Sequence, residues 1–525
     1  MTACAAEDAR LVRPPSRELK RFLIVMGLAA LLYAAGVNGH WRFQRDSAVY
    51  MTLARSLVEG RGYVVQSEFH TMCPPGWPAM LAGMYAVFGA PERITDSFLA
   101  LNVLVALLGL GCVAVFYLIL RELPLPHHHR FAVFLLYAFS RTHYYYSQYL
   151  MTDVPFTLFA LGAVYCGLRM LRAEGPRSWA WTGVCGLLTA CATAVRAVGP
   201  VVAVALTAGL WLGRGSLRRF GSNLGKTAVI CVLLGVVLAG WLSATRRAES
   251  GRADYFRGRL TGRAMLTMPV RGLGRVGEHL AGIGDAVCGT HVHWPTGLLL
   301  SALMVLGLAR ALRAREVAFS SYGVLCAAAV AAADWPLTAR YLLPALPVLF
   351  YWLVLGAASL GAFMRRGGRP RTQERVRTLG RVCIILLVAL NVARIGVLVA
   401  ESRVPRLRRE ADRGRREDYA ELAAWLRQNA APGDLVMAYE HTTIHYFTRL
   451  KAVHLPPDTR GRGAAWTLKR MAGHHVDWLV RDARKERSVL ALDAALAESP
   501  GLFELVLRTG DVDLFRVHRW RMRGP

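Results

Sequence analysis

The chain has 525 residues, of which 54% are hydrophobic and 19% charged, and its mean hydropathy is +0.32. This composition excludes an ordinary water-soluble enzyme, and the length exceeds that of one compact domain. The net charge of +29 does not indicate nucleic-acid binding, because the basic residues punctuate apolar segments and are not gathered with stacking aromatic residues. The composition predicts a polytopic membrane protein.

Apolar runs long enough to cross a bilayer, about 20 residues each, recur as far as position 400 and then stop. They predict eleven crossings, near 22–38, 97–120, 131–148, 154–171, 179–195, 198–213, 227–244, 294–310, 317–333, 341–363 and 382–400. The apolar stretch at 22–37 lacks a small-residue cleavage site, so we interpret it as a retained first helix.

Arginine and lysine are concentrated in alternate short loops, which orients the chain by the positive-inside rule. The basic loops include the N-terminal segment up to Arg21, the Arg214–Lys226 loop and seven arginines from Arg365 to Arg381. The N-terminus is therefore expected in the cytoplasm, and an odd number of crossings puts the C-terminal region outside. Membrane lipids account for part of the remaining positive charge.

Two long outer loops, 39–96 and 245–293, interrupt the crossings, and each contains one cysteine, Cys73 and Cys288. Oxidising conditions would permit a disulfide there, and the sequence leaves the paired and the free forms open. We assign 1–400, with these loops, to a transmembrane domain.

The composition changes after Glu401, where short strands alternate with helical segments. Strands are predicted at 435–439, 451–455, 476–480, 503–507 and 512–517, with Thr509-Gly510-Asp511 as a hairpin turn. We assign 401–525 to a small extracytoplasmic α/β domain, which is expected to cover or select substrates because it has no Gly-rich phosphate loop.

Two acids lie at outer ends of helices. Asp46 begins a segment whose apolar face, with Tyr50, can lie along the membrane surface, and Asp153 stands at the mouth of the fourth crossing. Helix capping explains either acid alone. A carboxylate at a membrane boundary nevertheless needs a partner or a water-filled cleft, so the two acids are also candidates to converge in one site.

Three further motifs lie on the same face. Pro74-Pro75-Gly76-Trp77 forms a rigid bend that either lines a pocket or only breaks a helix. Arg340 beside Tyr341, and also Arg196, can grip a phosphate with two hydrogen bonds or can anchor to lipid headgroups.

Together these residues carry a resemblance. The chain resembles the polytopic C-type glycosyltransferases in four motifs. These are Asp46 with Tyr50, Leu53, Ala54, Leu57, Gly60, Gly62 and Tyr63; the Pro74–Pro78 stretch; Thr152-Asp153-Val154-Pro155; and Arg340-Tyr341-Leu342-Leu343-Pro344 with Pro347. The chain is most similar to the bacterial branch of the protein O-mannosyltransferase and lipid A aminoarabinose transferase superfamily. One departure is Met72-Cys73, where the family often has a basic residue before the two prolines.

The resemblance implies an inverting transferase that moves a monosaccharide from a polyprenyl-phosphate carrier to a lipid, glycan or protein acceptor on the outer face of a bacterial plasma membrane. It implies Asp46 as the base and Asp153 as a second acid that orients the acceptor or holds a metal. Arg340, Tyr341 and Arg196 would face the donor phosphate, and Tyr50, Pro74, Pro75 and Trp77 would line the pocket. A divalent metal on Asp46 and Asp153, the sugar and the acceptor stay open.

The chemistry favours the same set, because displacement at an anomeric carbon needs a carboxylate for the hydroxyl proton and a cation for the departing phosphate. The main alternative is a lipid or sugar transporter or flippase without transferase activity. That alternative predicts inverted repeats and charges near the bilayer midplane, whereas the acids here gather at one face.

Overall fold

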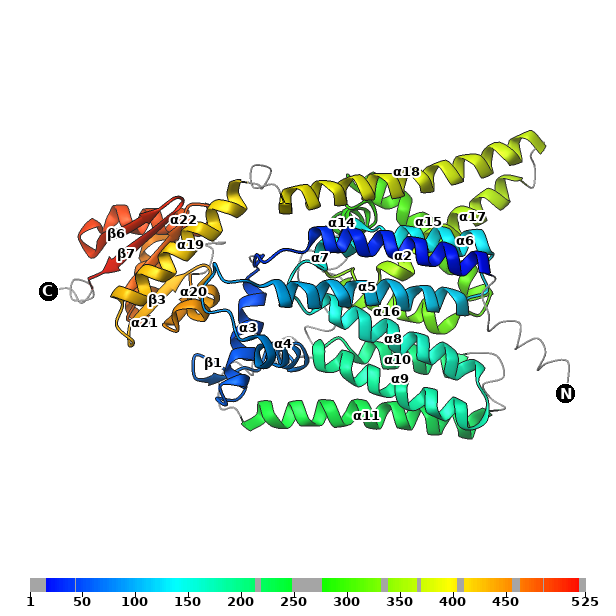
Figure 1. Cartoon of the computed structure of the whole chain (residues 1–525), viewed down its shortest axis with the longest axis horizontal. Coiled ribbons are helices and arrows are strands. Elements are labelled where there is room, and N and C mark those ends of the chain that lie inside the picture. The colour runs from blue at the N-terminus through cyan, green and yellow to red at the C-terminus, as the bar shows by residue number, and fades with distance from the viewer. Residues whose placement is uncertain are drawn as a thin grey trace.

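The computed structural model describes residues 16–42, 44–212, 219–247, 276–331, 339–365, 370–403, 410–455, 463–484 and 486–518. Long helices run side by side in a bundle, and a smaller unit with a β-sheet lies beyond one end of that bundle (Figure 1). The outer loop 245–293 is described only up to 247 and from 276 onward.

The bundle contains long apolar helices joined by short turns. Its helices are α2 (Ser16–Gly36), α5 (Leu99–Glu122), α6 (His127–Ala138), α7 (Arg141–Tyr146), α8 (Asp153–Arg172), α9 (Gly175–Val195), α10 (Pro200–Leu212), α11 (Phe220–Arg247), α14 (Val276–Cys288), α15 (Trp294–Arg313), α16 (Val317–Ala331), α17 (Leu346–Arg365) and α18 (Pro370–Arg403). Within the described residues, eight helices are long and apolar enough to cross a membrane, and Pro200–Leu212 and Val317–Val330 are shorter apolar helices. The chain is a multi-pass membrane protein.

The segment 131–148 differs from the single crossing predicted for it. Helix α6 ends at Ala138 and α7 starts at Arg141, because the Ser140 side chain accepts a hydrogen bond from the backbone N–H of His143 and caps a new helix. The part after Ser140 contains Arg141, His143 and Gln148, so it is less apolar than the first half of the segment.

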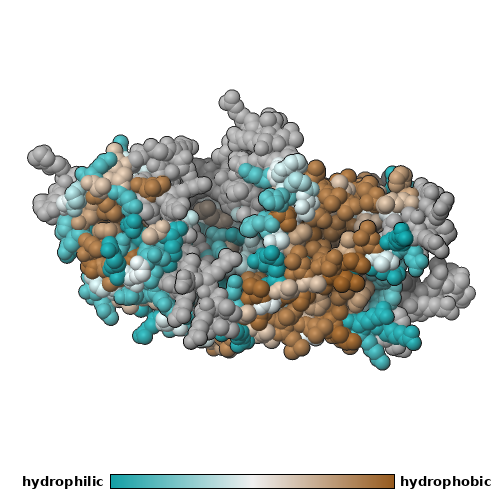
Figure 2. All heavy atoms as spheres, turned by 90° about the horizontal axis from the view of Figure 1, so that it is seen from above, coloured by the Kyte–Doolittle hydropathy of each residue, from teal (hydrophilic) through white to brown (hydrophobic). Residues whose placement is uncertain are grey.

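Hydrophobic residues dominate the helical part of the molecule, whereas the C-terminal unit shows hydrophilic residues mixed with hydrophobic ones, and hydrophilic residues gather at the opposite end of the bundle (Figure 2). This distribution matches a bilayer around the helices. The 39–96 segment lies between the bundle and the C-terminal unit and forms α3 (Arg45–Val58), a hairpin of β1 (Val64–Val65) and β2 (Glu68–Phe69), and α4 (Gly76–Phe88).

The C-terminal unit has a mixed five-stranded sheet in the order β4-β3-β5-β7-β6. The pairs β3–β4 and β3–β5 are parallel, and β5–β7 and β6–β7 are antiparallel. Its elements are α19 (Glu410–Asn429), β3 (Leu435–Ala438), α20 (His441–Thr448), β4 (Lys451–His454), α21 (Gly463–His474), β5 (Trp478–Asp482), α22 (Glu486–Glu498), η4 (Pro500–Leu502), β6 (Phe503–Thr509) and β7 (Val512–Val517).

Alternate residues of the central strands serve two cores, as the pleat requires. Val436 and Val480 pack in the cluster that contains Tyr419 of α19, whereas Met437 and Leu479 pack with residues of α21 and α22. The α/β unit predicted from the sequence is therefore present, with its strands close to the expected positions.

The outer segment 39–96 is tied to the C-terminal unit through Tyr446. Arg55 of α3 donates to the carbonyl oxygen of Tyr446 in α20 at 2.9 Å, and its guanidinium lies 4.1 Å from the centre of that tyrosine ring. The Tyr446 hydroxyl in turn donates to the carbonyl oxygen of Pro91 at 2.9 Å and lies 3.1 Å from the Tyr85 hydroxyl.

Candidate functional site

Asp46 lies in the first turn of α3, where the positive end of the helix dipole favours a carboxylate. The capping position belongs to Gln44, so Asp46 is not the cap residue that one interpretation of the sequence suggested. Its side chain is 49% exposed. The carboxylate is therefore fixed near the helix start and accessible from outside the protein.

Asp153 is the first residue of α8, and its side chain is fully buried. Burial of an ionised carboxylate is costly unless partners compensate its charge. Both carboxylate oxygens have such partners. Arg196 Nη1 donates to Oδ1, and Arg340 Nε donates to Oδ2 at 2.9 Å.

Arg340 joins the two acids. Its Nη1 donates to Asp46 Oδ2 at 3.0 Å while its Nε holds Asp153. Arg340 stands in the turn before α17, and Arg196 is the residue that ends α9. The structure thus brings Asp46, Asp153, Arg196 and Arg340 together from four separate parts of the chain.

Aromatic rings lie beside the two guanidinium groups. The Tyr341 ring centre is 5.6 Å from Arg340 Cζ and 6.0 Å from Arg196 Cζ, and Phe156 is 5.8 Å from Arg196 Cζ. Cation–π attraction at these distances helps to hold both cations in place.

The acids keep Arg340 charged. Burial alone would lower the pKa of its guanidinium, but the attraction of Asp153 and Asp46 outweighs burial and raises the pKa above its ordinary value. Arg340 is therefore a permanent cation that touches both carboxylates.

Tyr50 and Cys73 lie next to the cluster and are neutral. Burial raises the pKa of the Tyr50 hydroxyl well above its ordinary value, and burial together with the nearby Asp46 charge raises the pKa of the Cys73 thiol to about 12. Neither group can act as a base at neutral pH.

Cys73 and Cys288 are both free thiols in the structure, so the disulfide left open by the sequence is not formed.

The Pro74-Pro75-Gly76 bend lies against the end of α9, just before Arg196. A Cβ atom on Gly76 would come within 2.7 Å of the carbonyl oxygen of Ala194, so a larger residue would push the two segments apart. Pro74 and Pro75 are partly buried at this contact. The bend therefore positions one of the two arginines.

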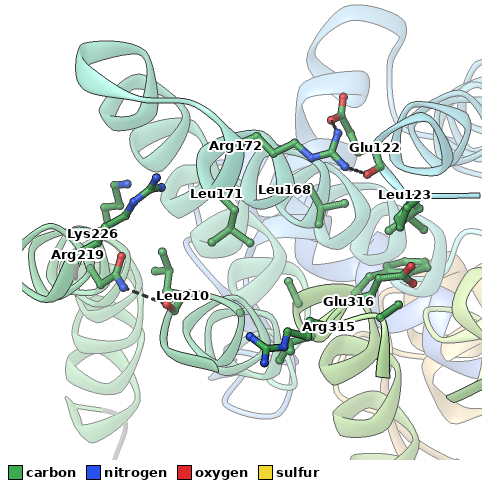
Figure 3. A pocket seen from close by; sticks show the side chains of 17 residues that line it. Glu122, Leu123, Leu168, Leu171, Arg172, Leu210, Arg219, Lys226, Arg315 and Glu316 are labelled. Carbon is green, nitrogen blue, oxygen red and sulfur yellow. Dashed lines mark hydrogen bonds and ion pairs between the residues drawn. The ribbon is translucent and has the colours of Figure 1, made fainter. Parts of the chain in front are cut away.

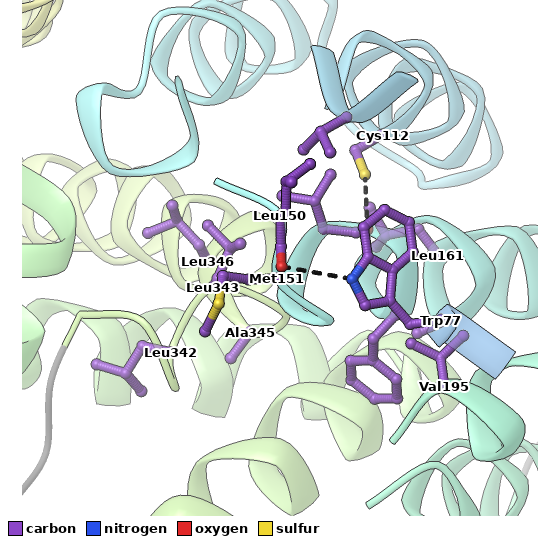
Figure 4. Packing of buried hydrophobic residues seen from close by; sticks show 14 of the residues in the cluster. Trp77, Cys112, Leu150, Met151, Leu161, Val195, Leu342, Leu343, Ala345 and Leu346 are labelled. Atoms are coloured by element: carbon purple, nitrogen blue, oxygen red, sulfur yellow. Dashed lines mark hydrogen bonds between the residues drawn. The ribbon is translucent and has the colours of Figure 1, made fainter. Parts of the chain in front are cut away.

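Trp77 differs from its predicted place on a pocket wall. It is fully buried, its indole N–H donates to the carbonyl oxygen of Leu150 at 3.4 Å, and Val195 and Leu161 lie around it (Figure 4). The tryptophan points into the apolar core because α4 packs onto α9 and α5, and it anchors the bend from behind.

Two further residues, Thr152 and Tyr146, lie at the site without a predicted role of their own. Thr152 lies close to the Tyr50 hydroxyl, and Tyr146 of α7 lies close enough to Asp153 and Arg340 to interact with them electrostatically. The position of Thr152 beside Asp153 was an available signal. Tyr146 had none, since it is one of four tyrosines between 144 and 149.

The residues do not fit a divalent metal ion held between the two aspartates. Both oxygens of Asp153 are engaged by arginine, and the Arg340 guanidinium occupies the position between the acids that a cation would need. Within the described ranges, no group of three or more His, Cys, Asp or Glu side chains could hold a metal.

Comparison with known protein families gives a match over part of the chain. The family "Dolichyl-phosphate-mannose-protein mannosyltransferase" matches residues 62–242, which contain Asp153 and Arg196 but neither Asp46 nor Arg340. Comparison with curated proteins gives no match.

Solved structures match nearly the whole chain. ArnT from Cupriavidus metallidurans in the apo state has 13% identity, a TM-score of 0.59, and coverage of 97% of this chain and 100% of that chain. The same protein bound to undecaprenyl phosphate has 13% identity and a TM-score of 0.59, over 95% and 98% of the two chains. Archaeal oligosaccharyltransferase AglB from Archaeoglobus fulgidus, in complex with an inhibitory peptide and a dolichol-phosphate, has 12% identity and a TM-score of 0.58, over 95% and 74%.

Proposed function

We propose that this chain, which has the C-type glycosyltransferase fold that its sequence motifs predict, is a glycosyltransferase that uses a polyprenyl-phosphate-linked sugar. The observation that carries the proposal is the Asp46–Arg340–Asp153–Arg196 cluster, in which one carboxylate is exposed and the other is buried. Two solved neighbours that share the fold contain undecaprenyl phosphate or dolichol-phosphate, which supports a carrier of this class.

The two acids are suited to different roles. Asp46 is half exposed and is bonded to Arg340 through Oδ2, so we assign it as the base that an acceptor hydroxyl meets. Asp153 is enclosed and has an arginine on each oxygen, so we assign it to positioning Arg196 and Arg340. This second role replaces the metal or acceptor contact that the resemblance suggested.

The proposed reaction is a single inverting displacement. The acceptor oxygen forms a bond to the anomeric carbon and gives its proton to Asp46, while the bond from that carbon to the carrier phosphate oxygen breaks and its electron pair stays on the phosphate. Arg340 and Arg196 would compensate the charge of the leaving phosphate.

The bridge through Arg340 links these events electrostatically. Two aspartates and two arginines give the cluster no net charge while both acids are ionised. When Asp46 takes up the acceptor proton it becomes neutral, and Arg340 keeps a charge that Asp46 no longer balances. That charge becomes available as the departing phosphate gains negative charge.

We further propose that the sugar is a monosaccharide, that the cluster faces the outside of a bacterial plasma membrane, and that the N-terminus is cytoplasmic. Arg172, Arg219 and Arg315 lie together at the end of α8 remote from Asp153, which supports this orientation by the positive-inside rule. The C-terminal unit would then lie outside, above the site, where it can select acceptors.

The test uses the full purified chain in nanodiscs with radiolabelled undecaprenyl-phosphate monosaccharides and an envelope extract as acceptor source. Release of carrier phosphate with transfer of label is expected. Asp46→Asn should reduce the rate by about 10²–10⁴-fold, because an amide cannot accept the hydroxyl proton.

The matched control is Asp96→Asn, which alters a carboxylate of the same outer segment that accepts hydrogen bonds from the backbone of Glu92 and Arg93. It should keep the rate. Full activity of Asp46→Asn would remove Asp46 as the base. Absence of donor consumption by the unmodified protein, with membrane passage of labelled lipid instead, would favour the transporter alternative.

A further inference from the structure

A second polar region lies at the other end of the helical bundle. A cavity of about 450 Å³ opens between α8, α10, α11 and the turn that joins α15 to α16 (Figure 3). Arg172, the last residue of α8, lines it, whereas Asp153 is the first residue of that helix. A 20-residue helix is about 30 Å long, so the cavity is remote from the aspartates.

The acid on the α5 side of the cavity is already compensated. Glu122 forms ion pairs with Arg169 at 3.2 Å and with Arg172 at 2.7 Å. Two arginines therefore pair with one carboxylate, and this wall of the cavity has no excess negative charge.

The opposite wall contributes an uncompensated cation. Lys226 of α11 is 6% exposed, lines the cavity, and forms no hydrogen bond or ion pair among the described residues. Arg219 lies seven residues earlier, just before α11, and lines the same cavity. It forms an exposed ion pair with Glu174 at 3.1 Å, which a bound phosphate would share. Between Arg219 and Lys226, Asn223 donates to the carbonyl oxygen of Leu210 at 3.0 Å and holds α11 against α10.

The turn after α15 adds a third cation at some cost in backbone energy. Arg315 has a φ of 59°, in the left-handed region where glycine is the usual residue at a helix end. Its neighbour Glu316 has a buried Oε2 atom without a partner, and burial raises the pKa of that carboxyl to about 7. Glu316 is therefore only about half ionised at neutral pH and balances only part of the positive charge.

Apolar surface continues from this basic cavity toward the lipid. Leu168, Leu171 and Leu210 line its interior. Beside it, Phe220 and Leu224 of α11 are 55% and 53% exposed, so they face the bilayer. A site with cations at the membrane boundary and an apolar flank is typical of a lipid headgroup site between transmembrane helices.

We infer that this cavity binds a phosphate group, with an anionic membrane phospholipid as its source and Lys226 as the central contact. The headgroup phosphate would lie between Lys226, Arg219 and Arg315, and the acyl chains would extend along α11. The site is separate from the proposed transfer reaction and does not depend on it.

The experiment measures thermal unfolding of the full chain in detergent with added phosphatidylglycerol, phosphatidylcholine of the same acyl chains, or inorganic phosphate. Phosphatidylglycerol should raise the unfolding temperature and phosphatidylcholine should not. Lys226→Met keeps the length of the side chain and removes its charge, and it should weaken the apparent affinity for phosphatidylglycerol about tenfold, the worth of one charged hydrogen bond.

The matched control is Arg177→Met, which removes an exposed charge from the start of α9, outside the lining of the cavity. It should leave the affinity unchanged. Arg219→Gln provides a second variant at the exposed edge of the cavity, should Lys226→Met fail to fold, and it should also weaken binding.

Equal stabilisation by the two lipids, or unchanged affinity in Lys226→Met or Arg219→Gln, would overturn the inference. A shift by inorganic phosphate alone that Lys226→Met abolishes would support the phosphate site and assign a soluble anion as its source. None of these readouts uses transfer activity, so they stay informative if the proposed function is wrong.

Discussion

The two ends of α8 use charge in opposite ways. At its first residue, two aspartates and two arginines satisfy one another through short contacts, and the sum of their charges is zero. At its last residue, Arg172, Arg219, Lys226 and Arg315 line a cavity with Glu122 and Glu316, and Lys226 has no partner within the described residues. The net charge of the balanced cluster changes when a proton moves, whereas the excess positive charge of the unbalanced one is compensated only when an anion binds.

The largest effect should come from removing the buried acid of the balanced end. Asp153→Asn leaves Arg196 and Arg340 without the carboxylate that both contact, and loss of one partner from a buried ionic network costs about 3–5 kcal/mol. Thermal or chemical unfolding of the purified protein checks this. Asp46→Asn is the control, since its half-exposed ion pair with Arg340 should contribute below about 1 kcal/mol.

If Asp153→Asn unfolds like the unmodified protein, Asp153 does not hold the arginines in the way that its burial suggests. The opposite order, with Asp46→Asn the less stable variant, would reverse the roles assigned to the two acids.

A smaller effect is expected when the bridge between the acids is removed. Arg340→Ala should raise the concentration of carrier-linked sugar needed for half-maximal rate by about tenfold or more, because a charged contact to the donor phosphate is lost. The acceptor requirement should change less. Arg93→Ala removes an exposed arginine from the same outer region and serves as the control. Unchanged carrier dependence would take Arg340 out of phosphate binding.

A change of stability with pH is expected at the unbalanced end. The pKa of Glu316 is raised by burial from 4.5 to about 7, so the folded protein holds a proton that the unfolded chain releases. Stability should therefore fall as pH rises from 4.5 to about 7 and stay lower above that. Glu316→Gln should flatten this fall and leave the stability below pH 4.5 unchanged. A pH profile of the unfolding temperature compares the two proteins, and identical slopes would contradict the raised pKa.

Local features of the sequence predicted much of this architecture. Apolar runs gave the positions of the long helices, and the alternation of strands and turns after Glu401 gave a sheet whose β6–β7 hairpin turns where Gly510 stands. Asp46, Asp153, Arg196 and Arg340 were selected because each is a charged residue at the outer end of an apolar segment.

Features that depend on contacts between distant segments were not predictable in this way. The Arg340 bond to Asp46 joins residues 294 positions apart, and no local pattern indicates that one arginine serves both acids. The enclosure of Trp77 and the cavity around Lys226 likewise arise from helices that meet only in the folded protein. The break between α6 and α7 is capped by one side chain, Ser140, which stands at the end of an apolar run.

Helix α3 makes the orientation of the proposed base, Asp46, depend on the position of the C-terminal unit. Its 14 residues span about 21 Å, with Asp46 in the first turn and Arg55 in the last, and Arg55 is clamped by Tyr446 of the C-terminal unit. A displacement of α20 would therefore tilt a stiff rod whose far end is the carboxylate. Binding of a ligand to the C-terminal unit and the alignment of the Asp46 carboxylate are thus coupled through one rigid helix, α3.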